Sequence, residues 1–263
     1  MRSFTVTTTW GQQHWNVYAK RCVESIIANW PAEVKKIFYP DDTAQQIVAD
    51  NCFYHNLKNN QPELQEFIDR NSNNQLIKER MDNPRRSAFE YDAVRFSYKV
   101  FCMLDAAERC DTDVLIFIDA DTVTYKSIPI EWLDHIAPHD KFTTFLGRPK
   151  KGFSETGFIT FNLALPESQQ FFARWREYYK KDLWQNLKGF TDSFTYDAAR
   201  LDTTDRSLDN DLNDGRYLGY RGSKHPFVNS ELGDYMDHLK GDRKDIQSSV
   251  EDMKVKRQDD HWR

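Results

Sequence analysis

The stretch Asp113-Val114-Leu115-Ile116-Phe117-Ile118-Asp119-Ala120-Asp121 decides the fold of this chain. Its five consecutive apolar residues, 114–118, form the pattern of a strand buried on both faces, which is typical of a parallel or mixed sheet. Two carboxylates, Asp119 and Asp121, follow the strand. Because burying an unpaired carboxylate is costly, the pair predicts a shared cation, Mg²⁺ or Mn²⁺. Open α/β sheets bind ligands beyond the carboxyl ends of their strands, so the stretch predicts a metal-assisted phosphate or nucleotide site.

The composition indicates a globular protein with a polar surface. With 263 residues, 39% of them hydrophobic and 29% charged, the chain is long enough for one large α/β domain or two small ones. The net charge of −5 provides no basic field for nucleic acid. The four cysteines are scattered without a CxxC pair, so we expect reduced thiols rather than a disulfide framework or a zinc site. Residues 1–20 lack an apolar signal core and no apolar run approaches the length of a membrane span, so we expect a soluble, cytoplasmic protein.

The first part of the chain has a βαβ pattern. Strand formers fill 3–9, apolar residues recur at helical spacing over 15–30, and 34–39 has the pattern of a second strand. The polar segment 44–86 predicts an excursion over the surface with one short helix at 62–69.

A long amphipathic helix is predicted at 87–109, just before the buried strand. Ser87 and Glu90 have the spacing of a capping box at its start. The later elements are a helical turn led by Pro129, strands near 142–146 and 157–163, helices from 166 and at 192–201, and a turn-rich segment at 203–219. Together they predict one α/β domain over 1–245, with a central mixed and mostly parallel sheet flanked by helices. The remaining residues, 246–263, form a charged tail whose charge density predicts a solvated helix or disorder.

Three D-x-D triplets occur in the chain, and their contexts differ. The triplets 111–113 and 209–211 lie in predicted turns, where Asp is common. Only Asp119 and Asp121 end a buried strand, so their context singles them out. The alternative is that these two residues cap a turn or the helix near Pro129.

A second segment, His238-Leu239-Lys240-Gly241-Asp242-Arg243-Lys244, has the pattern H-x-x-G-x-x-K. The neutral imidazole of His238 can be a third metal ligand. Gly241 allows the backbone to approach a phosphate closely, and Lys244, with Lys240 or Arg243, can neutralise a diphosphate. The alternative is a solvated basic turn in a charged tail.

Taken with the strand-end carboxylates, this segment resembles the family 8 glycosyltransferases of the GT-A fold, which include glycogenin and bacterial lipopolysaccharide galactosyltransferases. The resemblance implies a GT-A, Rossmann-like fold. It also implies that Asp119, Asp121 and His238 hold Mn²⁺ (or Mg²⁺) on the diphosphate of a nucleotide sugar. Gly241 and Lys244 would then contact the phosphates.

The same resemblance implies further contacts to the donor. It places them at Ala120 between the carboxylates, at Arg95 and Lys99 on the preceding helix, and at Thr7, Thr8 and Thr9 on the first strand, which would hold the base and ribose. The alternatives are surface salt bridges for the basic pair and plain β-propensity for the threonines. One departure from the family pattern is Asp245, which stands where the family has Pro, and the Trp that follows there is missing.

Two more segments resemble the part of the family site that surrounds the transferred sugar. Glu155-Thr156-Gly157-Phe158 resembles an Asn-small-Gly-hydrophobic segment, with Glu in place of Asn, and 191–193 resembles an Asp-Gln segment that contacts sugar hydroxyls. Glu155 and Asp192 are therefore the candidate catalytic residues. The alternatives are a strand bulge at Gly157 and a helix N-cap at Asp192.

We therefore expect a metal-dependent glycosyltransferase that moves a sugar from a nucleoside diphosphate sugar to an acceptor hydroxyl. The family resemblance favours a UDP-sugar donor, retention of anomeric configuration, and a carbohydrate or glycoconjugate acceptor. If the reaction instead inverts configuration, Glu155 or Asp192 is the candidate base.

Two other classes of protein share part of the pattern. Asp119-Ala120-Asp121-Thr122-Val123 also fits the nucleophile segment of haloacid-dehalogenase-like phosphatases, in which Gly241-Asp242 would be a late metal-binding segment. That segment normally follows the first strand of its fold, whereas two strands are predicted before it here. A sugar- or nucleotide-binding module without turnover is the other alternative, although such a protein is expected to lose a metal carboxylate or the basic phosphate contacts.

Overall fold

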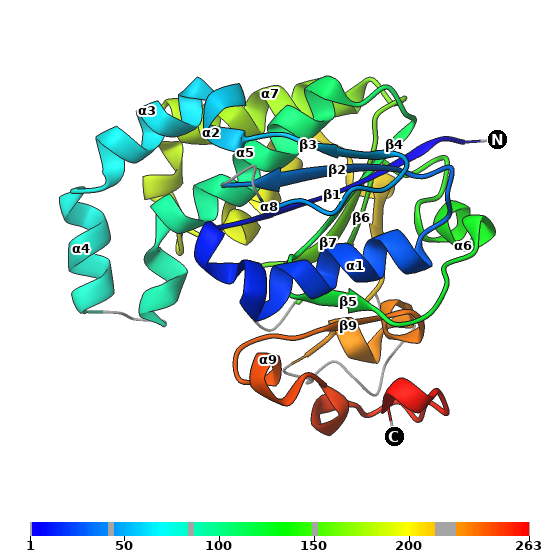
Figure 1. The fold of residues 1–263 in the computed structure, drawn as a ribbon. Coiled ribbons are helices and arrows are strands. Elements are labelled where there is room, and N and C mark those ends of the chain that lie inside the picture. Colours follow the sequence, from blue (N-terminus) through cyan, green and yellow to red (C-terminus); the bar gives the residue numbers. More distant parts are fainter. Residues whose placement is uncertain (1, 42–44, 84–86, 149–151, 214–224, 263) are drawn as a thin grey trace.

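The computed structural model describes residues 2–41, 45–83, 87–148, 152–213 and 225–262. A seven-stranded sheet in the order β3-β2-β1-β4-β7-β6-β8 forms its centre (Figure 1). The strands are β1 (Phe4–Trp10), β2 (Lys35–Pro40), β3 (Cys52–Tyr54), β4 (Val114–Ile118), β6 (Thr143–Leu146), β7 (Glu155–Asn162) and β8 (Asp209–Asp211). The predicted α/β fold with a mixed, mostly parallel sheet is confirmed.

Only β7 runs against the other strands of this sheet. It pairs antiparallel with both β4 and β6, while the remaining neighbours pair in parallel. The start of β7 therefore lies beside the end of β4, where Ile118 pairs with Phe158 and the Asp119 amide donates to the Gly157 carbonyl at 2.9 Å. This topology brings Glu155 to the same edge of the sheet as the strand-end carboxylates.

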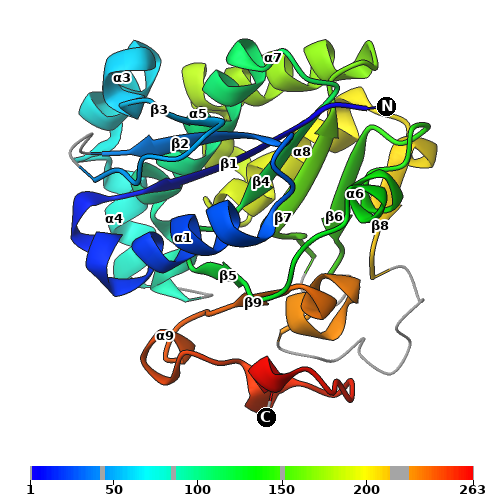
Figure 2. The ribbon, with the colours of Figure 1, turned by 45° about the vertical axis from the view of Figure 1, so that its right-hand side comes forward.

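Helices cover both faces of the sheet (Figures 1 and 2). One face carries α5 (Ala93–Arg109), α7 (Glu167–Lys180) and α8 (Asp192–Thr203), with α3 (Pro62–Asn71) packed outside α5. The other face carries α1 (Lys20–Asn29) and α6 (Ile130–Ile136). Two apolar clusters result, one around Phe101, Trp175 and Tyr196 and one around Val23 and Leu133.

Strong local patterns placed the predicted elements well. The predicted strand 114–118 has the bounds of β4, and 15–30 forms a π-helical turn, η2 (Trp15–Ala19), that continues into α1. The predicted capping box is wrong. Ser87 precedes a short 3₁₀ turn, η3 (Ala88–Tyr91), without a side-chain cap, and the Asp92 carboxylate instead accepts the Arg95 amide at 3.0 Å where α5 begins.

The excursion 44–86 contains more structure than its polar composition indicates. In addition to α3, it holds β3, α2 (Leu57–Asn60) and α4 (Gln75–Asp82). Asn74 caps α4 by accepting the Leu76 amide at 2.9 Å, and Leu64 and Phe67 of α3 are buried in the core cluster around Phe101. Sparse apolar residues therefore stabilise these helices through tertiary packing.

Several short strands in the second part of the chain were not predicted from the sequence. β5 (Thr122–Thr124) and β9 (Met236–His238) form a separate two-stranded antiparallel sheet. The predicted turn at 209–211 is instead β8, in which Asp211 accepts the Gly147 amide at 2.7 Å. Of the predicted turn-rich segment, 214–219 lie outside the described residues.

The tail differs from the predicted solvated helix or disorder. It runs through short turns beneath β5 and β9, from α9 (Arg243–Ile246) through η9 (Val250–Asp252) to η10 (Asp260–Trp262) (Figure 1). Trp262 is buried and donates to the Tyr125 hydroxyl at 2.8 Å, and Arg257 donates to the Ser230 carbonyl at 2.7 Å. These contacts hold the tail against the domain despite its high charge density. Within the described residues, no helix combines the length and the apolar character that crossing a membrane requires.

Candidate metal and donor site

The predicted metal carboxylates lie in the turn between β4 and β5. The Thr122 amide donates to the Asp119 carbonyl at 2.9 Å and closes this turn. The side chain of Asp119 is 26% exposed to solvent and that of Asp121 is 15% exposed. The buried strand thus ends by presenting two partly accessible carboxylates.

His238 reaches these carboxylates through the small sheet. In that sheet His238 pairs with Thr122, and the Leu239 amide donates to the Asp121 carbonyl at 2.8 Å. The Nε2 atom of His238 lies 3.3 Å from Asp119 Oδ2 and 3.0 Å from Asp121 Oδ1. The structure therefore brings the three predicted metal ligands together.

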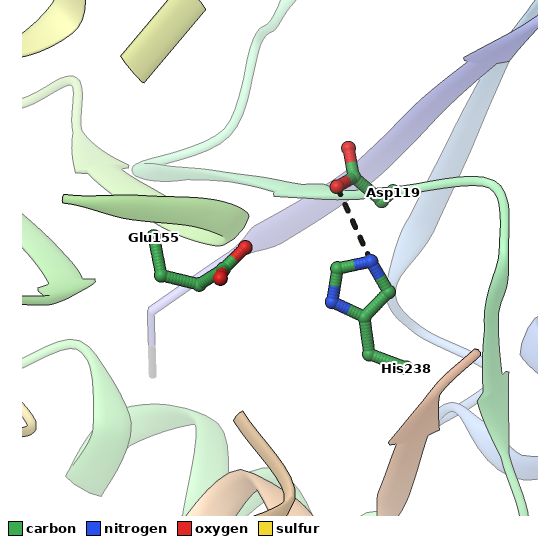
Figure 3. A group of neighbouring side chains, drawn as sticks. All are labelled: Asp119, Glu155 and His238. Carbon is green, nitrogen blue, oxygen red and sulfur yellow. Dashed lines mark ion pairs between the residues drawn. The ribbon is translucent and has the colours of Figure 1, made fainter. Parts of the chain in front are cut away.

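Glu155 is a further oxygen donor at the same place (Figure 3). Asp119, Glu155 and His238 each offer a ligand atom, and these atoms lie within 4.8 Å of one another. The sequence indicated Glu155 only as a residue near the sugar, because its proximity to the metal carboxylates depends on the antiparallel pairing of β4 and β7. Carboxylate oxygens with one imidazole are a donor set that suits Mn²⁺ or Mg²⁺.

Gly157 makes this arrangement possible. A Cβ atom at this position would lie 2.4 Å from His238 Cε1 and 3.2 Å from Glu155 Oε1. The glycine is therefore required by close approach of the His238 ring.

Lys99 of α5 connects two carboxylates of the site. Its Nζ atom lies 2.7 Å from Asp119 Oδ1 and 2.9 Å from Asp192 Oδ2, and donates to the Thr156 carbonyl at 2.7 Å. Burial alone would lower the pKa of Lys99, but the two carboxylates outweigh it and the pKa is raised. Lys99 was predicted to contact the donor, and it lines the cavity described below, but its ammonium group is engaged by Asp119 and Asp192.

Both strand-end carboxylates are held in the ionised form. Burial by itself would raise the pKa of Asp119, but Lys99 and His238 outweigh it and hold this pKa well below its usual range. The pKa of Asp121 is also lowered, because His238 and Lys244 outweigh burial. Lys244 Nζ lies 2.8 Å from Asp121 Oδ2. Both carboxylates are therefore charged at neutral pH.

A cavity of about 500 Å³ lies beside the carboxylates. Its lining includes the predicted donor residues Thr9, Arg95, Lys99, Asp119, Ala120, Asp121 and Lys244. Aromatic residues that were not among the predicted site residues also line it, namely Trp10, His14, Tyr18, Phe89, Phe96, Tyr98 and Phe117. Thr7 and Thr8 are fully buried and do not line the cavity, so of the predicted threonine run only Thr9 faces it.

The remaining predicted residues lie at or near the same edge. Asp192 is the first residue of α8, whose N-cap residue is Thr191 rather than Asp192, and its carboxylate accepts the Thr156 hydroxyl at 2.5 Å. Gly241 adopts a positive φ of 57° in the turn before α9, which favours glycine. A larger hollow of about 810 Å³ lies between α5 and α7, and none of the predicted site residues lines it.

Comparisons with known proteins identify the fold. No protein-family model and no curated protein sequence matches the chain. Mouse xyloside xylosyltransferase 1, in its apo form, matches with a TM-score of 0.54 and 10% identity over 92% of this chain and 99% of that one. At this identity the similarity shows the fold alone, and the predicted GT-A fold is confirmed.

Two other similar structures are also glycosyltransferases. The apo structure of WbbM, described as a bifunctional glycosyltransferase, matches with a TM-score of 0.47 and 12% identity over 91% of this chain and 46% of that one. The glycosyltransferase GlyE of Streptococcus pneumoniae matches with a TM-score of 0.44 and 12% identity over 87% of this chain and 51% of that one. These scores are too low to support any argument.

Proposed function

We propose that this protein is a metal-dependent glycosyltransferase, similar to family 8, that moves a sugar from a nucleoside diphosphate sugar to an acceptor hydroxyl. The observation that carries the proposal is the convergence of Asp119 and Asp121 with His238, at the edge of a GT-A sheet and beside a cavity. We take the donor to be a UDP-sugar and the acceptor to be a carbohydrate or glycoconjugate.

Different residues of the site would hold different parts of the donor. Asp119, Asp121 and His238 would hold a Mn²⁺ or Mg²⁺ ion, which would supply electrostatic stabilisation of the charge that grows on the leaving diphosphate. Lys244 and Arg95, at the cavity wall, neutralise the phosphates. The aromatic lining offers flat surfaces to the base.

The residues on the sugar side orient the reaction. Asp192 is paired with Lys99, so it is suited to accept hydrogen bonds from sugar hydroxyls rather than to remove a proton from the acceptor. We therefore propose retention of anomeric configuration, with Asp192 and Glu155 positioning the sugar. An inverted product, identified by NMR of the anomeric proton, would overturn this part of the proposal.

The phosphatase alternative is not favoured by the fold. Three strands, β1 to β3, precede β4 in the chain, whereas the nucleophile segment of those phosphatases normally follows the first strand. Asp242, the late metal ligand that this alternative needs, is exposed.

The test is donor hydrolysis. The protein is incubated with Mn²⁺ and a panel of sugar nucleotides, with a generic phosphate monoester in parallel, and released nucleoside diphosphate is measured. We expect slow donor hydrolysis, and Asp121→Ala should reduce it by about 10²- to 10³-fold, a typical effect of removing an electrostatic group. The matched control is Asp111→Ala, which removes an exposed Asp of another D-x-D triplet and should leave the rate unchanged.

The outcomes separate the three classes of protein. Hydrolysis of the monoester alone would support the phosphatase. Tight donor binding with neither activity would support a binding module without turnover.

A further inference from the structure

Two cations of the site share a single carboxylate. Glu155 is buried, with 4% of its side chain exposed, and its Oε2 atom is in contact with both Arg148 and Lys240. The neighbouring carboxylates have other partners, since Asp119 and Asp192 contact Lys99 and Asp121 contacts Lys244. Arg148 and Lys240 therefore share one carboxylate in direct contact, although Glu90, Asp119 and Asp192 also act on Arg148 through their charge.

Both cations can be reached by a ligand. The side chain of Lys240 is 29% exposed to solvent and that of Arg148 is 16% exposed. The Arg148 Nε atom is buried and has no hydrogen-bond partner among the described residues. A partly buried guanidinium with an unpartnered N–H group can donate hydrogen bonds to an anion that enters beside it.

These cations lie apart from the cavity that would hold the nucleotide. Arg148, Glu155 and Lys240 do not line that cavity, although Lys99, Asp119 and Asp121 do. Glu155 nevertheless presents an oxygen within 4.8 Å of ligand atoms on Asp119 and His238. Arg148 and Lys240 therefore lie beside Glu155 and outside that cavity, and Glu155 belongs to the segment that resembles the surroundings of the transferred sugar.

We propose that Arg148 and Lys240 form an anion subsite that recognises a carboxylate or phosphate group on the saccharide substrate. This inference rests on the proposed function and narrows the substrate class to acidic sugars. The planar guanidinium of Arg148 can bind such a group through two parallel hydrogen bonds, and Lys240 adds a compact charge. Glu155 holds both cations in place until the acidic group arrives.

The test compares matched pairs of ligands in the presence of Mn²⁺. In the donor arm, titration calorimetry measures the affinities for UDP-glucuronic acid and UDP-glucose, which differ only in the carboxylate. In the acceptor arm, transfer from a neutral donor to methyl glucuronide or glucose 6-phosphate is compared with transfer to methyl glucoside or glucose. We expect a preference of roughly tenfold or more for the acidic member in one of the two arms, and that arm identifies the source of the anionic group.

Two variants should change the preference for the acidic ligand in opposite directions. Arg148→Gln should bring the acid-to-neutral ratio close to one, mainly by weakening the acidic member of each pair. Glu155→Gln should raise the ratio, because it frees both cations, and a purely structural role for Glu155 would not produce this change. The matched control is Arg176→Gln on α7, outside the site, where Arg176 also contacts two carboxylates, Glu63 and Glu108.

Three results would overturn the inference. The first is a ratio near one in both arms for the wild-type protein. The second is a ratio that Arg148→Gln does not change. The third is an equal loss of affinity for UDP-glucose and UDP-glucuronic acid in that variant, because Arg148 would then serve the diphosphate. In each case binding of the neutral donor still supports the proposed function, whereas absence of binding by every nucleotide sugar refutes that function itself.

Discussion

Replacing Lys99 with methionine should weaken the fold and strengthen metal binding at the same time. Methionine keeps an apolar side chain of similar length but removes the charge that lies 2.7 Å from Asp119 and 2.9 Å from Asp192. Only 12% of the Lys99 side chain and 3% of the Asp192 side chain are exposed, so water cannot replace the lost partner. Breaking a buried ion pair in this way destabilises a protein by about 3–5 kcal/mol.

A bound metal should recover part of this loss. A divalent cation on Asp119 replaces the missing charge for one of the two carboxylates, so we expect Mn²⁺ to restore about half of the lost stability. Because linkage is reciprocal, the variant should also bind Mn²⁺ roughly tenfold more tightly than the wild type. Urea unfolding with and without Mn²⁺ measures the first effect, and titration calorimetry measures the second.

Two further variants separate the causes. Lys99→Met combined with Asp192→Asn also removes the charge of the more deeply buried of the two carboxylates, so the double variant should be more stable than Lys99→Met alone. Lys35→Met removes an ion pair with the exposed Asp111 and should change the stability by less than about 1 kcal/mol. The reasoning is refuted if Lys99→Met loses less than about 1 kcal/mol, or if it binds Mn²⁺ more weakly than the wild type.

Two other features of the site region give predictions. Gly157→Ala places a methyl group 2.4 Å from His238 Cε1, so the ring must move, and calorimetry should show Mn²⁺ affinity reduced by about 10- to 100-fold; unchanged affinity would contradict the packing argument. Burial is the main cause that lowers the pKa of His225 to about 3, so between pH 6.5 and pH 3 the unfolded chain binds the extra proton and the free energy of unfolding falls as the pH falls. Urea midpoints from pH 7 to pH 4 measure this fall, which should be smaller in His225→Asn.

Sequence reasoning succeeded where local pattern dictates structure. Five apolar residues bounded by polar ones are too short a run for a buried helix and favour a buried strand, and β4 has the predicted bounds. It failed where a strand is short and its partner is distant. Asp209-Asn210-Asp211 has the composition of a turn, yet pairing with β6 makes it a strand, so tertiary context outweighs local preference.

The same distinction applies to the site. Asp119, Asp121 and His238 could be predicted because each stands in a recognisable segment, and the structure places them together. Thr7 and Thr8 could not be separated from Thr9, since the strand formers of β1 give no sign of which residue reaches the cavity. Arg148 carries no local signal, because its position follows from a loop that Asp211 holds at the Gly147 amide.

The pairing of β5 with β9 has a consequence for how the protein assembles. His238 comes from a strand far along the chain from Asp119 and Asp121, and the loop between them must close before the three ligands can meet. A chain that ends before β9 would contain every strand of the large sheet and both carboxylates, but it would lack the imidazole. Such a fragment should not bind Mn²⁺ with the affinity of the full chain. Metal affinity should therefore report that the chain has folded as far as β9, and during refolding it should appear after the central sheet has formed.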